Sequence, residues 1–398
     1  MQPDTDFKRV RYAFIEPSSE RNLEVFNIET IKVLDTVLHL HPEYETLTCL
    51  NSGRTQALLE GTRQLSLLVT TPFNLFAPVF NDLQSWEALV ANWASDSVMR
   101  VKELAPKQVA TVQLYQIRHA NQLYIHLIRE FAANYVLAPA IFGMSREVMT
   151  FLGNLSASNE IALLYNIGPV PLFKWRMDIS RFWFDHSSKA LTRAKTSHYI
   201  MQTSPPENKI SNLPRQANWD AYGLKKALLE DYMDALLAYG FRAASVSKIM
   251  RRAAGEVRNR FKSIHGRPST CGSTPRSVTW IHSNSKHRLH ATFFTYLYRN
   301  ANSDSSRAYL PFLASLNLYE KMFSNFENEQ HLTVDRAFNM LLTMAFDSSV
   351  NIGACKRCTT QYLIANSAEK IELAERYWCP FCSHRQPGKF SGTSATSP

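Results

Sequence analysis

Two Cys-x-x-Cys pairs near the C-terminal end of the 398-residue chain place the strongest constraint on its fold. Cys355 and Cys358 form the first pair, Cys379 and Cys382 form the second, and 20 residues separate them. At this distance two pairs supply four thiolates to a tetrahedral Zn²⁺ and leave no coordination position open for a substrate. The apolar residues 362–364 between them suit a strand of a small ribbon. We therefore expect one structural zinc ion, with two unrelated buried pairs or a redox-active dithiol as the alternatives.

The other two cysteines, Cys49 and Cys271, are isolated. The N-terminal residues are polar and contain no apolar signal region. The longest nearly apolar run, residues 135–144, has about half of the roughly 20 residues that a membrane-spanning helix needs. These features predict a cytoplasmic protein without a membrane partner, in which paired cysteines hold a metal instead of forming disulfides.

Apolar residues recur at helical spacing along most of the chain, and only 13 glycines are present. The clearest stripe lies within residues 332–349 and consists of Val334, Ala337, Phe338, Leu341, Leu342 and Ala345. A stripe of this kind is typical of a helix with one buried face. We therefore predict a mostly α fold, made of helical modules with a helix-turn-helix and a C-terminal four-cysteine zinc ribbon.

The chain is too long for one ordinary hydrophobic core, so we expect several domains. Proline-containing clusters with few apolar anchors predict a linker over residues 186–220, where the main domain boundary belongs. The segments that we expect are an N-terminal extension (1–52), two helical modules (53–105 and 106–185), that linker, a helical basic domain (221–352), the zinc ribbon (353–384) and a disordered tail (385–398).

The two helical modules share a plan of consecutive amphipathic helices. At an offset of 62 residues, segment 73–105 aligns with segment 135–167, so that Phe80 meets Phe142 and Asn92 meets Asn154. Few of the aligned positions are identical. The pattern fits either a diverged duplication or a chance register between amphipathic helices.

Positive charge is concentrated in residues 242–288, which carry eleven Lys or Arg residues and one acid, Glu256. Eleven minus one is +10, which equals the formal net charge of the whole chain, so the residues outside this segment sum to zero. A positive charge confined to so short a segment indicates a polyanionic partner.

Within this segment, residues 243–250 and 256–264 have the pattern of two short helices joined by a turn at Ala254-Gly255, which is typical of a helix-turn-helix. Val257, Phe261 and Ile264 would face inward, and Arg258, Asn259, Lys262 and His265 would face outward. The candidate DNA-contacting residues are Lys248, Arg251, Arg252, Arg258, Asn259, Arg260, Lys262 and Arg267. A solvated basic helix face is the alternative interpretation.

Double-stranded DNA is the preferred partner because the segment lacks the interleaved aromatic residues expected of a platform that stacks on RNA bases, and Phe261 falls on the apolar face. An RNA-binding or structural nucleoprotein factor that uses the same basic segment is the alternative. No catalytic set is recognisable: Gly53-Arg-Thr lacks the rest of a phosphate loop, and His282, His287 and His290 have no nearby carboxylate and suit a surface or phosphate-contacting role. We therefore expect no enzyme, although an enzyme with the ribbon as a docking arm is a third hypothesis.

Residues 225–385 resemble FlhC, the C subunit of the bacterial flagellar master transcriptional activator. The resemblance rests on Gly255 with the helix to Ile264, Gly266-Arg-Pro268, Thr279-Trp280, His290-Ala-Thr-Phe-Phe294 and the helix that leads into the cysteines. It implies zinc at the four cysteines, promoter DNA and RNA polymerase as partners, and activation of transcription.

Residues 107–178 resemble FlhD, the partner subunit, without gaps from Gly143 to Leu163 and again over Phe173-Lys-Trp-Arg-Met-Asp178. If residues 53–105 are a second, diverged copy, one chain contains two D-like modules and one C-like module. In the FlhD–FlhC complex D subunits outnumber C subunits two to one, so the resemblance implies a homodimer or homo-oligomer of the fused chain. The expected targets are flagellar operons, or conjugation genes as in relatives on mobile elements.

Overall fold

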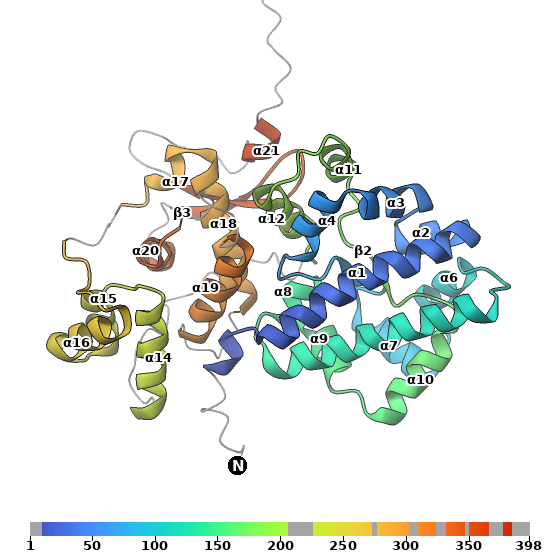
Figure 1. The fold of residues 1–398 in the computed structure, drawn as a ribbon, viewed down its shortest axis with the longest axis horizontal. Helices are drawn as coiled ribbons and strands as arrows, with labels where there is room; N and C mark the ends of the chain where they lie inside the picture. Colours follow the sequence, from blue (N-terminus) through green and yellow to red (C-terminus); the bar gives the residue numbers. More distant parts are fainter. Residues whose placement is uncertain are drawn as a thin grey trace, which may run out of the picture.

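The computed structural model describes residues 10–205, 226–272, 277–301, 309–323, 332–346, 350–365 and 377–383. These residues are mostly helical, with two small antiparallel sheets of two strands each, which confirms the prediction of a mostly α fold (Figure 1). The predicted tail, residues 385–398, and residues 206–220 of the predicted linker lie outside the described residues.

The N-terminal unit, residues 10–205, is a helical array around one short sheet. Its elements are η1 (Arg11–Ala13), α1 (Pro17–Leu40), η2 (Pro42–Tyr44), α2 (Glu45–Thr48), α3 (Ser52–Glu60), α4 (Thr62–Val69), β1 (Phe76–Pro78), α5 (Leu83–Ala91), α6 (Asp96–Glu103), α7 (Thr111–Asn134), α8 (Ala138–Phe142), α9 (Arg146–Gly153), α10 (Ala157–Ile167), β2 (Phe173–Trp175), α11 (Ser180–Ser187) and α12 (Arg193–Gln202).

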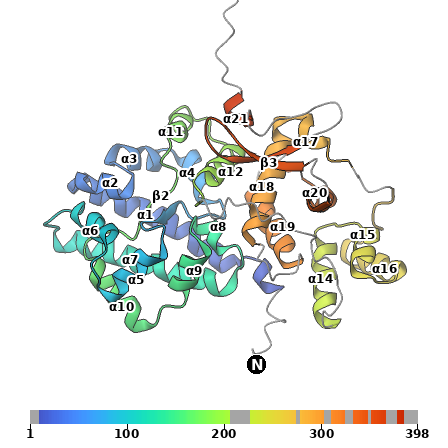
Figure 2. The same ribbon diagram turned by 180° about the vertical axis from the view of Figure 1, so that it is seen from behind.

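The C-terminal unit contains the described residues from 226 onwards. Its elements are α14 (Lys226–Ala238), α15 (Ala243–Met250), α16 (Ala254–His265), α17 (Trp280–Ser283), α18 (Ser285–Ala301), α19 (Tyr309–Phe323), α20 (Val334–Phe346), β3 (Val350–Ala354), β4 (Gln361–Ala365) and α21 (Pro380–Ser383). Helices α18 and α19 lie beside the N-terminal unit, whereas α14, α15 and α16 lie on the far side (Figures 1 and 2).

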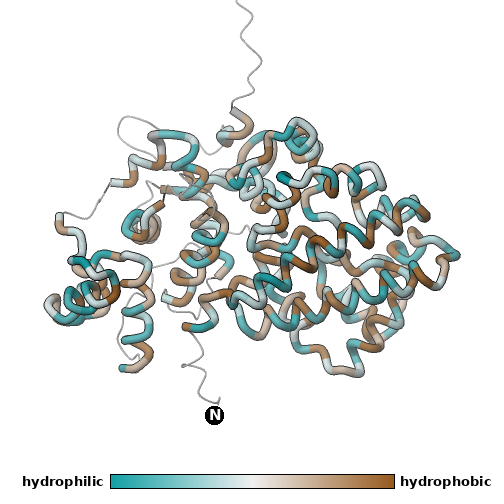
Figure 3. The backbone as a smooth tube through the Cα atoms, viewed as in Figure 1, coloured by the Kyte–Doolittle hydropathy of each residue, from teal (hydrophilic) through white to brown (hydrophobic). Residues whose placement is uncertain are grey.

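The core of the N-terminal unit forms where α1 and α7 cover the β1–β2 sheet. Phe26 of α1 and Tyr124 of α7 pack on Phe76 and Phe173 of the two strands, with ring centroids 5.4–6.2 Å apart. Hydrophilic and hydrophobic residues alternate along these helices, as expected when only one face is buried (Figure 3). Among the described helices, none has both the length and the apolar composition to cross a membrane.

Helix α1 is part of this core, whereas the sequence predicted an N-terminal extension over residues 1–52. The helix begins at Pro17, whose fixed φ suits the first turn, and it packs on both α3 and α7. In the first half of α1, Leu23 and Phe26 are buried but stand among polar and charged residues, so the apolar stripe is hard to recognise in the sequence.

The elements of the N-terminal unit repeat, but not at the predicted offset of 62 residues. At that offset strand β1 would correspond to the helix α8. The helices α1 and α7 begin at Pro17 and Thr111, 94 residues apart, and the helices α5 and α11 begin at Leu83 and Ser180, 97 residues apart. The repeat therefore covers residues 17–103 and 111–202, so its first copy does not begin at residue 53.

Residues 193–202, which lie in the predicted linker, form the buried helix α12. Seven of its ten residues are buried, and Thr192 caps its N-terminus by accepting a hydrogen bond from the Lys195 N–H. Because several of the buried side chains are polar, such as Thr196 and His198, the segment lacks the apolar stripe by which a buried helix is recognised. Its polar composition resembled that of a linker.

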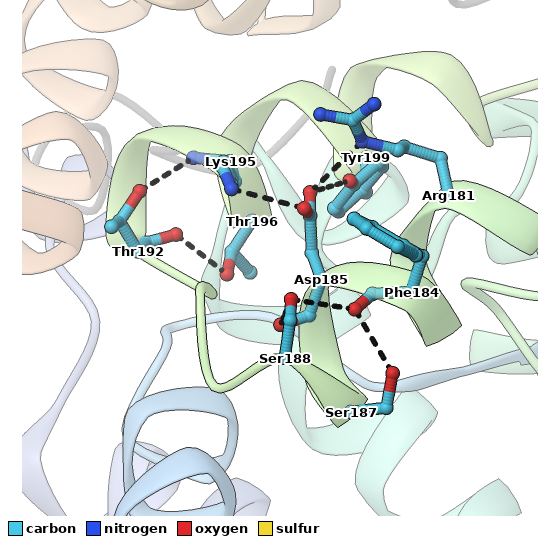
Figure 4. Close-up of polar contacts among 9 residues, drawn as sticks. All are labelled: Arg181, Phe184, Asp185, Ser187, Ser188, Thr192, Lys195, Thr196 and Tyr199. Atoms are coloured by element: carbon cyan, nitrogen blue, oxygen red, sulfur yellow. Dashed lines mark hydrogen bonds and ion pairs between the residues drawn. The ribbon is translucent and has the colours of Figure 1, made fainter.

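A buried carboxylate joins α12 to α11 (Figure 4). Asp185 accepts hydrogen bonds from the Tyr199 hydroxyl at 2.5 Å and from Lys195 Nζ at 3.0 Å, and Arg181 Nε lies 3.4 Å away. Burial acts to raise the pKa of Asp185, but the bonds from Tyr199 and Lys195 outweigh it and hold this pKa below its ordinary value. The charged form of Asp185 is therefore the one that this network stabilises.

Candidate metal centre and nucleic-acid interface

The four cysteines of the two predicted pairs meet at one end of the β3–β4 hairpin. Cys355 directly follows β3, Cys379 directly precedes α21, and Cys382 lies within α21. All four sulfur atoms lie within 4.8 Å of one another, and three of the four residues are buried. Sulfur atoms in a tetrahedral zinc site, with zinc–sulfur bonds of about 2.3 Å, lie about 3.8 Å apart. The four-cysteine cluster therefore has the spacing of a metal site.

Backbone hydrogen bonds shape both cysteine loops. The Thr359 N–H donates to the Cys355 carbonyl oxygen at 2.8 Å, and Thr359 itself has a positive φ of 60°. In the second loop the Cys382 N–H donates to the Cys379 carbonyl oxygen at 3.0 Å. The Cys379 N–H also donates to Cys355 Sγ at 3.3 Å. The sulfur ligands, the spacing between them and the backbone hydrogen bonds of the two loops thus all fit a metal ion held by four thiolates.

Hydrogen bonding and burial shift the pKa values of the cysteines in opposite directions. The hydrogen bond with Cys379 lowers the pKa of Cys358 to about 2, and the same bond raises the pKa of Cys379. Burial raises the pKa of Cys382 to about 12. Thiolates this close repel one another, so all four lose their protons together only when a bound cation neutralises them.

His198 of α12 connects the metal centre to the N-terminal unit. Its Nδ1 lies 2.7 Å from the hydroxyl of Tyr362 in β4, and its ring stacks on Phe381 of α21 at a centroid distance of 4.5 Å. A hydrogen bond from His198 also contributes to the lowered pKa of Cys358. The sequence gave no sign of this role, because His198 is more than 150 residues from the first cysteine pair and lies in the predicted linker.

The predicted DNA-binding helices are α15 and α16, which pack on each other and on α14. The predicted turn at Ala254-Gly255 is wrong, since Gly255 lies inside α16. The chain turns instead at Arg251, which has a φ of 52°, and Ser247 Oγ donates to the Arg252 carbonyl oxygen at 2.7 Å. The two helices are therefore joined by three residues, 251–253.

The inward face of α16 agrees with the prediction at Val257 and Phe261, which are buried, but not at its C-terminal end. Ile264 was expected inside and is 41% exposed. His265 was expected outside, but its Nε2 lies 2.7 Å from the Leu237 carbonyl oxygen at the end of α14, and its ring packs on Phe261. The carbonyl groups at a helix end need hydrogen-bond partners, and His265 supplies one.

Seven of the eight candidate DNA-contacting residues are exposed and one is half-buried. The exposed residues are Lys248, Arg251, Arg258, Asn259, Arg260, Lys262 and Arg267, and the half-buried residue is Arg252. Arg260 differs from the rest because its guanidinium is bound to the Asp234 carboxylate of α14, with Nε at 2.6 Å. An arginine in such a pair has less freedom to reach a second partner.

The two ends of the basic segment have structural roles. Arg242 lies 3.5 Å from the Asp335 carboxylate, and the Arg288 guanidinium lies 5.6 Å from the ring centre of Tyr377. The expectation of a surface role for His290 is wrong, because this residue is buried and its Nδ1 lies 2.8 Å from the Tyr319 hydroxyl. Within the basic segment, the exposed Lys and Arg residues that the structure describes thus lie between residues 248 and 267, apart from Lys286.

The C-terminal part of the chain matches a known protein family. Residues 235–394 match the family model described as flagellar transcriptional activator (FlhC). The matched segment contains α15, α16 and all four cysteines. No curated protein matches the chain. The matched family is one of transcriptional activators and not of enzymes, and the predicted resemblance of the C-terminal part to FlhC is confirmed.

Proposed function

We propose that this chain is a sequence-specific, DNA-binding transcriptional activator of the FlhD–FlhC type. The observation that carries the proposal is the FlhC match, because the matched segment contains both the exposed basic residues of α15–α16 and the four-cysteine cluster. It acts in the cytoplasm, on promoter DNA and together with RNA polymerase. Its targets are flagellar operons, or conjugation genes if the chain belongs to a mobile element.

One structural Zn²⁺ is the proposed cofactor, held by Cys355, Cys358, Cys379 and Cys382. Four thiolates fill the tetrahedral coordination of this ion and leave no position for a substrate. Metal binding of this kind contributes roughly 10–16 kcal/mol in small zinc peptides, which is enough to fix a short hairpin with a limited core of its own. The zinc ribbon would then hold β3, β4 and α21 against α18, where the Leu363 N–H donates to Thr292 Oγ1 at 3.1 Å.

Helix α16 is the proposed recognition helix, inserted into the major groove. Arg258, Asn259 and Lys262 lie on its exposed face. Arg or Lys can pair with guanine and Asn with adenine in the major groove. The other candidates, which are Lys248, Arg251, Arg252 and Arg267, flank this face and would contact phosphates. Arg260 would act mainly through Asp234, by fixing α16 on α14.

The N-terminal unit is proposed to consist of two FlhD-like modules. The resemblance to FlhD over residues 107–178 covers α7 to β2, and the structural repeat supports a second module of the same plan. The repeat starts that module at residue 17, in place of residue 53. One chain would then carry two D-like modules and one C-like module, and would assemble further as a homodimer or homo-oligomer.

Two experiments test the proposed function. Genomic fragments recovered on the purified zinc-loaded protein should cluster at promoters and would name the target operons, whereas a random distribution would contradict sequence-specific binding. Competition of a bound, labelled duplex by single-stranded RNA separates the two nucleic-acid hypotheses. Duplex DNA should compete better than the RNA, and preference for RNA would favour the nucleoprotein alternative.

A further inference from the structure

Helix α12 is the part of the N-terminal unit that reaches the metal centre. Its His198 is 3% exposed, and the ring stacks on that of Phe381 with the two planes 21° apart. The Tyr362 hydroxyl lies 2.7 Å from Nδ1 of the same ring. Tyr362 belongs to β4, which follows the first cysteine pair, and Phe381 lies between Cys379 and Cys382. One side chain of the N-terminal unit therefore contacts the ribbon beside both cysteine pairs.

The position of Phe381 depends on the metal centre. Helix α21, which carries Phe381, has only four residues, and a helix this short is not stable by itself in water. The cysteines on either side of Phe381 fix it in place, because both belong to the four-cysteine cluster. Thiolates at this spacing repel one another, so a bound cation is needed to hold the second pair against the first. We therefore expect the stacking of Phe381 on His198 to form together with the metal centre.

His198 also contacts a ligand of the metal centre. It hydrogen bonds with Cys358, and this bond is one cause of the lowered pKa of that thiol. A neutral imidazole has one nitrogen that donates and one that accepts, whereas a metal-bound thiolate only accepts. Since Nδ1 lies on the Tyr362 hydroxyl, all three groups are satisfied when Tyr362 donates to Nδ1 and His198 donates to Cys358. A donor of this kind orients the ligand and stabilises its charged form.

Helix α12 is held within the rest of the molecule as well. Next to His198, the Tyr199 hydroxyl donates to Asp185 of α11 (Figure 4). Just beyond the end of the helix, the hydroxyls of Ser204 and Tyr296 lie 2.6 Å apart, which joins this segment to α18. Helix α18 in turn packs on β4. A displacement of the N-terminal unit from the ribbon therefore moves His198 away from its partners.

Another buried histidine has nearly the same surroundings without a cysteine. His290 of α18 is 2% exposed, its Nδ1 lies 2.8 Å from the Tyr319 hydroxyl, and its ring centre lies 4.4 Å from that of Phe323. Tyr319 and Phe323 both belong to α19, whose sequence contains no cysteine. His290 is thus a core residue satisfied in the same way, and the hydrogen bond with Cys358 is what His198 has in addition.

We propose that His198 is a positioning residue of the metal centre, through which metal binding and the docking of the N-terminal unit on the zinc ribbon stabilise each other. The docked unit supplies the hydrogen-bond donor to Cys358, and the bound metal fixes Phe381 under the imidazole ring. Such a coupling is reciprocal, so docking and metal binding change each other's equilibrium by the same factor. Loss of a group that hydrogen bonds to a metal ligand typically weakens metal binding about 10- to 100-fold. This coupling requires the proposed zinc ion, but it does not require DNA binding.

The first test measures the zinc affinity of the full-length chain by competition with a chromophoric chelator. His198→Phe keeps an aromatic ring beside Phe381 but removes both hydrogen bonds, and should raise the dissociation constant for zinc about 10- to 100-fold. His198→Gln can still donate and accept, and should recover part of this loss. His290→Phe is the matched control, which should lower the melting temperature without changing the zinc affinity.

The second test measures the reverse effect in the wild-type chain, so it does not depend on the folding of any variant. Amide hydrogen exchange is compared between the zinc-loaded chain and the chain stripped of zinc by a chelator. Removal of zinc should speed the exchange of the α12 amides by up to the same factor, about 10- to 100-fold. The amides of α5, a helix of the same unit that packs on α10, should exchange at an unchanged rate.

Three results would overturn the proposed coupling. They are an unchanged zinc affinity in His198→Phe, an equal loss of affinity in His290→Phe, and exchange of the α12 amides at the same rate with and without zinc. A wild-type chain that binds no zinc would refute the metal centre itself and the coupling with it. The affinity of the wild-type chain therefore separates a failure of the metal centre from a failure of the coupling alone.

Discussion

Replacement of Arg258 and Lys262 by alanine tests the proposed recognition helix through the salt dependence of DNA binding. Both side chains are exposed on α16, four residues apart, and they do not pack in its core. Each phosphate contact contributes about 0.9 to the slope of log affinity against log salt concentration. Between 50 and 200 mM salt, one contact thus accounts for about a 3.5-fold loss of affinity, and two contacts account for about a 12-fold loss.

The measurement is fluorescence anisotropy of a labelled duplex, taken from a recovered genomic fragment, over a series of salt concentrations. Each single variant should bind more weakly and show a slope smaller by about 0.9, and the double variant by about 1.8. Arg63→Ala is the matched control, because Arg63 is an exposed arginine on α4 of the N-terminal unit. It should leave both affinity and slope unchanged.

Arg260→Ala gives a second comparison within the same helix. Because Arg260 is bound to Asp234, its loss should change the slope less than the loss of Arg258, and should lower stability by about 1 kcal/mol or less. Unchanged slopes in both Arg258→Ala and Lys262→Ala would refute the placement of α16 on DNA. A slope reduced equally by Arg63→Ala would show that the effect follows net charge alone.

Three further predictions concern the metal centre and the folding of the N-terminal unit. Cys358→Ser should lose the single bound zinc in a metal analysis and Cys271→Ser should retain it, so a full equivalent of zinc in Cys358→Ser would contradict the four-cysteine site. Asn121→Ala leaves the Val170 carbonyl oxygen and the Leu172 N–H without partners, and should lower the free energy of unfolding, measured in urea, by about 3 kcal/mol. Asn27→Ala removes the same two bonds from the other copy and should lower the free energy of unfolding by a similar amount. A large difference between the two variants would contradict the equivalence of the two asparagines in the repeat. The lowered pKa of Asp185 means that its carboxylate contributes stability above its unfolded pKa of about 3.9, and loses it as the pH falls through the folded value. The melting temperature of Asp185→Asn should therefore fall less steeply below about pH 4 than that of the wild type, and parallel curves would exclude this carboxylate as a source of the acid sensitivity.

The metal centre could be predicted from sequence because its constraint is local. Two Cys-x-x-Cys pairs fix the ligand type and spacing, whatever the rest of the chain does. The surroundings of the centre could not be predicted in this way. His198 reaches Tyr362 over 164 residues of chain, and it lies on a helix whose buried residues are largely polar.

The basic helices show where helical periodicity stops being informative. Val257 and Phe261 were assigned to the inner face correctly, since each is followed by another turn of α16. The last turn depends on its neighbour instead: His265 is drawn inward by the Leu237 carbonyl oxygen, and Ile264 is left exposed. A hydrogen-bond acceptor on another helix is not visible in the local sequence.

The correct offset of the structural repeat could not be recognised in the sequence, because apolar residues recur periodically along every amphipathic helix. The predicted offset of 62 and the observed offset of 94 differ by 32 residues, which is about nine helical turns, so apolar stripes also align at the wrong offset. In addition, the offset between the two copies is not constant. Helix α10 has 11 residues and its counterpart α4 has 8, so the offset increases from 94 residues before these helices to 97 residues at the strands. The positions that define the repeat, Asn27 and Asn121, are polar and carry no weight in an alignment of apolar residues. It follows that duplications in helical proteins are better sought through buried polar residues that bind the backbone, because these residues fix one register.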